Sequence, residues 1–307
     1  MKIRFNWLVT FLGWLIFQSC VSPDSSHQKK TGLYETGHFK KYWYNGQAEI
    51  NTFHLEQSRY GQTREGKAVL IFVSEDFSRL KEVKLDHAEA AGADKVNVLK
   101  MNFTKNFVTG IYPYSMMLSV FTPTNRSSFS TTLKATMSSQ EWCGQVFTQL
   151  NLRNNKYQIQ SFSYFENEGD QSIDLKLNWL EDELWNLIRL DPTKLPTGTI
   201  NIIPGFFFSR LLHTDLVAVP VTLTLNSSGE EMVYQLMMPT HDRMLTIHFL
   251  QRFPHQITGW EERFLERGKE VLTKASLDKT LRLDYWTKNE NKHIGLRDSL
   301  GLSPTNF

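Results

Sequence analysis

Alternation of apolar and polar residues at a period of two is the feature that most limits what this chain can fold into. It is clearest in one segment, where the apolar positions are Val217, Val219, Val221, Leu223 and Leu225. Every second residue of a β-strand points to the same face, so this pattern predicts a strand with one fully apolar face. Residues 146–152, 245–249 and 281–285 alternate in the same way.

Further short segments with the composition of strands are separated by turn residues. They cover residues 47–60, 68–73, 96–103, 110–121, 129–137, 157–165 and 232–238. A bulge is expected near Thr52 and Phe53, where the alternation slips, and Asn154-Asn155 is expected to turn the chain into a hairpin. Short strands with little helix predict a mainly β fold, either an antiparallel sandwich or an open half-barrel.

One helix is expected between residues 178 and 190. Asn178 can cap it, with Glu181 completing a capping box, and Pro192 stops it. The acidic run 181–183 then lies in the first turn, where negative charge meets the positive end of the helix dipole. The predicted organisation comprises a signal peptide (1–19), a lipidated Cys with a flexible tether (20–40), an N-terminal β-rich half (41–172), a helical connector (173–197) and a C-terminal β-rich half (198–307).

The amino terminus has the composition of a secretory signal peptide. Lys2 and Arg4 precede an apolar run of about 11 residues, 7–17, which is too short to cross a bilayer. Ser19-Cys20 follows and resembles the bacterial lipoprotein signal, although Phe17 and Gln18 depart from its usual Leu and small residue. That resemblance implies acylation of Cys20, with palmitate-type chains holding the mature protein at a membrane. An ordinary cleaved signal peptide and a buried N-terminal helix are the alternatives.

The position after Cys20 bears on the membrane that would hold the chain. In some Gram-negative bacteria an Asp directly after the lipidated Cys retains a lipoprotein in the inner membrane, and here the acid comes later, at Asp24. We therefore expect the outer membrane, and its periplasmic face because no acidic cluster follows Cys20.

Composition excludes some functions and leaves others open. A net charge of +2 lacks the basic excess of nucleic-acid-binding proteins, and hydrophobic residues at 40% suffice for a packed core. The chain has two cysteines, so acylation of Cys20 would leave Cys143 without a disulfide partner. Cys143 could be a nucleophile if a His such as His213 or His241 approached it, but a lone Cys is more often a small packing group.

Other candidate sites have simpler structural explanations. His54 and Glu56 share one strand face but lack the further ligands of a metal site, so a solvated polar face is expected. The aromatic segments 110–114 and 204–208 could line a groove but more often fill a core. We find no phosphate-binding loop, no nucleophile elbow and no dinucleotide fingerprint, so no catalytic, metal or cofactor residue is assigned.

Several strings resemble a group of uncharacterised bacterial envelope lipoproteins. They are YWYNGQAEINTFHLEQSRYG, AVLIFVSEDFS, VNVLKMN, TGIYPYS, QEWCGQVF, LPTG and GWEE, and the resemblance covers about residues 40–300. Some members carry the label "septum formation inhibitor Maf". Genuine Maf proteins are cytosolic nucleotide pyrophosphatases with a Ser-x-Ser-Pro-Arg-Arg start, which this sequence lacks, so the label does not fit.

Two functional hypotheses follow from the sequence. In the first, the chain is a membrane-anchored lipoprotein with a binding or scaffolding role in the cell envelope. Its partners are the lipid bilayer, through acylated Cys20, and an apolar ligand or envelope protein, with no nucleic acid and no cofactor. In the alternative, it is a periplasmic hydrolase or thiol enzyme that uses Cys143.

Overall fold

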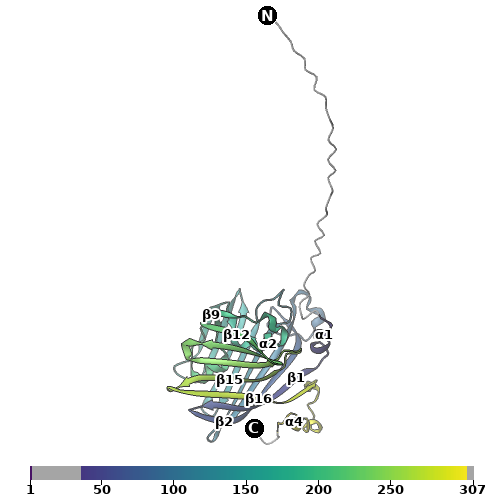
Figure 1. Cartoon of the computed structure of the whole chain (residues 1–307). Coiled ribbons are helices and arrows are strands. Elements are labelled where there is room, and N and C mark those ends of the chain that lie inside the picture. Colours follow the sequence, from purple (N-terminus) through teal and green to yellow (C-terminus); the bar gives the residue numbers. More distant parts are fainter. Residues whose placement is uncertain (2–35, 303–307) are drawn as a thin grey trace. The chain divides into compact units, whose positions relative to one another are not determined.

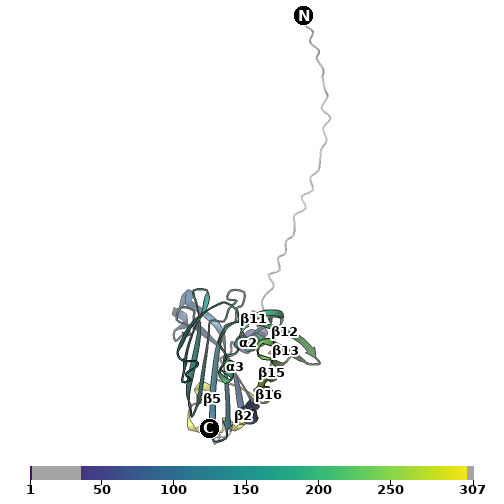
Figure 2. The same ribbon diagram turned by 90° about the vertical axis from the view of Figure 1, so that its left-hand side faces the viewer.

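The computed structural model describes Met1 and residues 36–302. In this part of the chain one sheet of 16 strands dominates the architecture (Figures 1 and 2). Its strands are β1 Ala48–Arg59, β2 Gln62–Ser78, β3 Val83–Lys84, β4 Lys95–Thr109, β5 Tyr112–Pro123, β6 Lys134–Glu141, β7 Gly144–Arg153, β8 Lys156–Ser163, β9 Gln171–Lys176, β10 Trp179–Leu180, β11 Gly198–Ile203, β12 Val219–Ser228, β13 Glu231–Met238, β14 Arg243–Leu250, β15 Ile257–Glu266 and β16 Lys269–Leu283.

The strand order shows how the two halves of the chain are joined. It runs β10-β11-β12-β13-β14-β15-β16-β1-β2-β4-β5-β6-β7-β8-β9, with β3 paired to β2. The pair β1–β16 links the last long strand to the first, and every neighbouring pair is antiparallel except β10–β11. Since β9 and β10 end the strand order of the described residues, the sheet is open. The mainly β prediction is confirmed, in its half-barrel rather than its sandwich form.

The helices are short. They are α1 Gly37–Trp43, α2 Glu181–Leu190, α3 Phe206–Leu212 and α4 Leu296–Ser299, and 3₁₀ turns cover Ala88–Ala90, Gly92–Asp94, Pro192–Lys194, Pro239–His241, Tyr285–Thr287 and Asn291–His293. Figure 2 shows α2 and α3 between two limbs of the sheet, with β2 and β5 on one side and β12, β13 and β15 on the other. No helix in the described part of the chain is both long and apolar enough to span a membrane.

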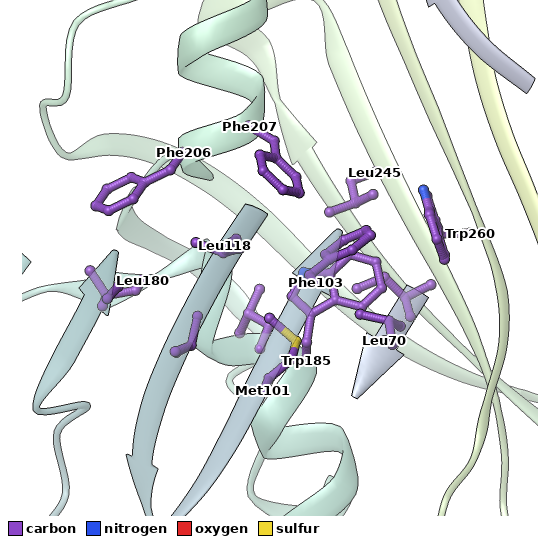
Figure 3. Close-up of a cluster of buried hydrophobic side chains, with 14 of the residues drawn as sticks. Leu70, Met101, Phe103, Leu118, Leu180, Trp185, Phe206, Phe207, Leu245 and Trp260 are labelled. Carbon is purple, nitrogen blue, oxygen red and sulfur yellow. The ribbon is translucent and has the colours of Figure 1, made fainter. Parts of the chain in front are cut away.

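The core lies where both limbs meet these two helices. Phe103 of β4 is in edge-on contact with Trp185 of α2, Phe207 of α3 and Trp260 of β15, with ring centroids 5.2–5.3 Å apart (Figure 3). Edge-to-face packing of buried aromatic rings adds to the free energy gained by removing their surface from water. One cluster therefore fixes α2 and α3 against both halves of the sheet.

The expected helix is present as α2, and all ten of its residues are buried. It begins at Glu181, with Leu180 rather than Asn178 at the N-cap, and the Leu180 backbone N–H donates to Glu183 Oε1 at 3.2 Å. The acidic run 181–183 lies in the first turn, as expected. It can be buried because the sheet supplies counter-charge, with Arg243 of β14 donating to both Glu181 oxygens at 2.6 Å.

Several local predictions can be compared with the strands. The bulge is confirmed, since the β1–β16 register shifts between Thr52 and Phe53. Asn154 and Asn155 both have positive φ and turn β7 into β8, as expected. Strand structure was expected from Lys41 onward, but Lys41–Trp43 belongs to α1, in which Phe39 and Trp43 pack into the core. Helix α3 was not predicted.

Candidate functional site: a cavity between helix α3 and strands β6–β8

Helix α3 is held at both ends. At its start, a Cβ on Gly205 would lie 2.5 Å from Glu181 Oε1, so this position accepts only glycine without rearrangement, and the Phe206 N–H donates to Asp182 Oδ2 at 3.0 Å. At its end, His213 adopts a left-handed conformation with φ 56°, and Arg59 of β1 donates to the Leu211 carbonyl. Contacts with α2 and β1 therefore fix the two ends of α3.

A cavity of about 160 Å³ lies between the C-terminal part of α3 and strands β6–β8. Its lining residues are Met137, Val146, Thr148, Ser161, Asn167, Glu168, Gln171, Phe206, Ser209, Arg210, His213, Thr214, Asp215 and Leu216. The buried members form its inner part, whereas Asn167, Gln171, His213 and Asp215 are exposed and mark its mouth.

The inner part of the cavity combines an apolar floor with a few polar groups. Met137, Val146 and Phe206 are buried there. The hydroxyls of Thr148 and Ser161 bond to each other across β7 and β8 at 3.0 Å. Over the whole lining, ten of the fourteen residues are polar or charged, so the cavity is more polar than most small-molecule sites.

Arg210 is the most unusual residue of the lining. Only 2% of its side chain is exposed, and its guanidinium carbon lies 4.4 Å from the ring centre of Phe165. Its nearest ion-pair contact, Nη2 to Glu141 Oε1, is 3.8 Å, which is too long for a hydrogen bond, and Nε and Nη1 have no hydrogen-bond partner among the described residues. Burial lowers the pKa of Arg210, but a guanidinium keeps its charge in proteins.

Two hydroxyls beside Arg210 also lack partners. Ser209 Oγ and Thr214 Oγ1 are buried and make no hydrogen bond to any described residue. A buried polar group without a partner costs about 1–3 kcal/mol, so such groups are rare in native proteins. These atoms have almost no accessible surface, so they lie behind the surface of the cavity rather than on it.

Glu168 holds the mouth of the cavity in place, and both of its carboxylate oxygens have partners. Glu168 accepts a hydrogen bond from Ser163 at Oε2 and pairs through Oε1 with His213 Nδ1. The ring of Phe165 packs edge-on against His213, with centroids 5.1 Å apart. The loop after β8 and the turn after α3 are therefore held together at the opening.

A second, smaller cavity lies deeper, beside the first turn of α2. Lys105, Asp182, Arg243 and Glu262 are among its lining residues. Its volume of about 30 Å³ holds no more than one or two water molecules, so it is not a site for an organic ligand. Burial, reinforced by the charge of Glu181, raises the pKa of Asp182 to about 8.

The two cysteines singled out from the sequence do not contribute to the cavity in the described part of the chain. Cys20 lies outside the described residues. Cys143 is exposed in the turn between β6 and β7, away from the cavity lining, and its backbone N–H donates to Glu141 Oε2 at 2.9 Å. The Glu141 carboxylate raises the pKa of the Cys143 thiol, which is opposite to what activates a nucleophile.

The structure also shows where the candidate histidines and the aromatic segment 204–208 lie. His213 lies at the cavity mouth, whereas His241 packs edge-on against Phe208. His54 Nε2 lies 3.0 Å from Glu65 Oε2, and together with Glu56 they form an exposed group whose ligand-type atoms lie within 4.8 Å of one another. The segment 204–208 proves to be the start of α3, and its Phe206 both packs in the core and lines the cavity.

Comparisons with known proteins add little. No protein-family description and no curated protein matches the chain. Among solved structures it is similar to a β-barrel-like protein of the domain of unknown function DUF1849 from Brucella abortus. The two chains are 10% identical with a TM-score of 0.37, over 78% of this chain and 98% of that one.

Sequence reasoning did not find Arg210, Ser209 or Glu168. The available signal was a charged residue two positions after three consecutive Phe residues, 206–208, a context in which a cation is buried with part of the core. Glu168 carried no comparable signal, because its loop meets α3 only through the curvature of the sheet.

Proposed function

We propose that this chain is a bacterial lipoprotein, anchored through Cys20, whose β-rich part binds a small organic molecule in the cavity between α3 and β6–β8. The observation that carries the binding role is the cavity itself, of about 160 Å³, in which the apolar side chains of Met137, Val146 and Phe206 lie beside polar side chains.

The cavity volume limits the size of the ligand. Apolar cavities of about 150 Å³ accept benzene, whereas drug-sized ligands occupy about 300–1,000 Å³. A cavity of about 160 Å³ therefore fits a molecule with roughly the bulk of one substituted ring. This size favours a small metabolite over a whole acyl chain or a peptide.

The anchor is proposed from the amino-terminal sequence. A basic start, a short apolar run and Ser19-Cys20 support acylation, and two or more acyl chains give stable membrane attachment. With no Asp directly after Cys20, the proposed location is the periplasmic face of the outer membrane.

The binding role is tested by filling the cavity. Val146→Trp places an indole on the cavity floor, and the matched control is Phe147→Trp, one residue along β7 on the exposed face. Native mass spectrometry of the mature chain, purified from envelope extract or soaked with single-ring metabolites, should show a bound small molecule in wild type and in the control. Its loss only in Val146→Trp supports the proposal, and equal retention in both variants contradicts it.

The anchor has its own test. Metabolic labelling with a fatty-acid probe should mark wild type and Cys143→Ala equally and leave Cys20→Ala unlabelled. Equal labelling of the Cys20→Ala variant would contradict anchoring through this residue.

A further inference from the structure

We propose that two copies of this chain associate through the outer face of strands β5–β8. This inference goes beyond ligand binding and does not depend on the cavity, which is lined by residues of the inner face. Alternate residues of β5, which are Tyr114, Met116 and Leu118, are buried in the core, and helices α2 and α3 lie on that side of the strand (Figure 2). The residues between them therefore point to the outer face.

A row of exposed apolar side chains crosses this outer face. Met117 of β5 is paired with Ser138 of β6, Ser138 with Phe147 of β7, and Phe147 with Phe162 of β8. Met117 is 41% exposed, Phe147 40% and Phe162 48%. Residues paired in register lie side by side on one face of a sheet, so these four positions form one continuous row. Exposed apolar patches on folded proteins mark interaction surfaces.

The rows on either side of this apolar row are polar but uncharged. One row consists of Ser119, Thr136, Gln149 and Gln160. The other consists of Ser115, Gln140, Gln145 and Tyr164. The outer face of β1 and β2 is charged by comparison, with ion pairs from His54 to Glu65 and from Lys67 to Asp278. Since the centres of protein interfaces are poor in charged residues and rich in aromatic residues and Met, the face of β5–β8 has the composition of an interface.

The absence of charge in these three rows favours a second copy as the occupant. In a two-fold dimer the same surface patch meets itself, so a surface with charges of one sign would place like charges close together. The three rows avoid this repulsion. A partner with a charged surface would lose the water around its charges and gain no counter-charge here. We therefore expect this face to bind a copy of itself.

The sizes of the side chains are also self-complementary. The outward residues Thr136 and Ser138 of β6 are small, whereas Phe147 and Gln149 of β7 are large. A two-fold axis parallel to the strands and between β6 and β7 would set Ser138 of each copy against Phe147 of the other. The same axis would set Thr136 against Gln149, so the small residues of one copy receive the large residues of the other. Two sheets that pack face to face with nearly aligned strands are common in β proteins.

The extent of the face sets the expected strength of the contact. Four strands at a spacing of about 4.8 Å, with three rows about 7 Å apart, cover roughly 20 Å by 20 Å including their side chains. A contact of this size belongs to the small, reversible interfaces, which bury less than about 1,200 Å² in total. The fraction of dimer should therefore rise with protein concentration.

Sedimentation velocity of the mature chain tests this inference, with detergent in excess so that one micelle does not hold two chains. Wild type should change from monomer to dimer between about 1 μM and about 1 mM. Phe147→Glu and Ser138→Lys should each weaken self-association at least tenfold, because a charge in the contact loses its water without gaining a counter-charge. The control is Met237→Lys, at an exposed residue of β13, which should associate as wild type does.

A mixture of the two variants tests the position of the two-fold axis. The glutamate introduced in one copy would face the lysine introduced in the other, and the second half of the contact would remain as in wild type. The mixture should therefore associate at least tenfold more tightly than either variant alone. Circular dichroism spectra equal to that of wild type establish that both variants are folded.

Three results would overturn the inference. They are a wild-type chain that stays monomeric up to about 1 mM, self-association of Phe147→Glu equal to that of wild type, and a mixture that associates no better than the separate variants. The first result would also make a different molecule the occupant of this face. None of them bears on the cavity, because a small molecule retained by monomeric wild type in native mass spectrometry would still support the proposed binding function.

Discussion

Arg189 of helix α2 and Glu49 of strand β1 form a two-point ion pair in the interior, with Nη1–Oε1 at 2.6 Å and Nη2–Oε2 at 2.7 Å. The two residues lie 140 positions apart in the sequence. Both are buried, and Tyr42 of the segment before the sheet also donates to Glu49. This pair ties the helix that connects the two halves of the chain to the strand at the centre of the sheet.

Breaking this pair should destabilise the protein strongly. Glu49→Gln leaves the Arg189 charge buried without compensation, which typically costs about 3–5 kcal/mol. The free energy of unfolding from urea titration should fall by about this amount. Asp174→Gln, which breaks the exposed pair with Lys156, should change it by less than about 1 kcal/mol. Similar losses in the two variants would contradict the importance of burial.

Asp182 makes stability depend on pH in a defined direction. Burial, with the charge of Glu181, raises its pKa to about 8 in the folded protein, above the usual value of 3.8. The folded state therefore binds a proton that the unfolded state has released, and the stability that this provides is lost as pH rises from about 4 to about 8.

Asp182→Asn should remove this dependence while keeping an acceptor for the Phe206 N–H. Relative to wild type, the variant should gain on the order of 2 kcal/mol or more between pH 5 and pH 9 in urea unfolding, since each unit of pKa difference corresponds to about 1.4 kcal/mol. The exposed change Asp174→Asn serves as the control and should show no such gain. A constant difference between Asp182→Asn and wild type across this range would show that Asp182 is not protonated in the folded state.

Gly205 should be sensitive to the addition of a single methyl group. In Gly205→Ala the new Cβ would lie 2.5 Å from Glu181 Oε1, an atom held by Arg243, so overpacking should cost about 1–3 kcal/mol. Gly37→Ala is the matched control, because its Cβ would meet nothing within 4 Å. Thermal unfolding should show a lower midpoint for Gly205→Ala only. Unchanged midpoints in both variants would mean that Glu181 can move aside.

Cys143 should react in the folded protein, but slowly. It is exposed, and the Glu141 carboxylate raises the pKa of its thiol, so little thiolate forms near neutral pH. Glu141→Gln should speed alkylation by iodoacetamide severalfold at pH 8. The two proteins should react equally at strongly alkaline pH, where both thiols are ionised. A slower reaction in the variant would contradict the role given to Glu141.

The regular parts of the fold could be predicted from the sequence because the alternation of apolar and polar residues that marks a strand lies within the strand itself. Alternation within residues 217–225 predicts which face of β12 is buried, although only Val221 and Leu223 are fully covered and Val217 is exposed outside the strand. The slip at Thr52-Phe53 marks the bulge without any knowledge of the partner strand. The helix at 181–190 was found from its apolar stripe and its stop at Pro192. These signals each lie within a few consecutive residues.

The site could not be predicted because it depends on contacts between distant segments. Arg210, Glu141 and Glu168 come from α3, β6 and the loop after β8, and no spacing in the sequence relates them. Helix α3 was not predicted because it has only seven residues and begins with three Phe. Consecutive Phe residues are equally typical of a buried segment without helical structure. The burial of α2 depends on two ion pairs with the sheet, Glu181 with Arg243 of β14 and Arg189 with Glu49 of β1.

The most direct test of the binding cavity is a titration of the ¹⁵N-labelled mature chain with single-ring metabolites, followed by heteronuclear NMR. We expect saturable shifts in the amides of residues 205–216 and of the facing segments 137–148 and 161–171, with the exposed residue His54 unchanged. Shifts that do not saturate, or that map to the outer face of the sheet, would contradict a ligand site between α3 and β6–β8.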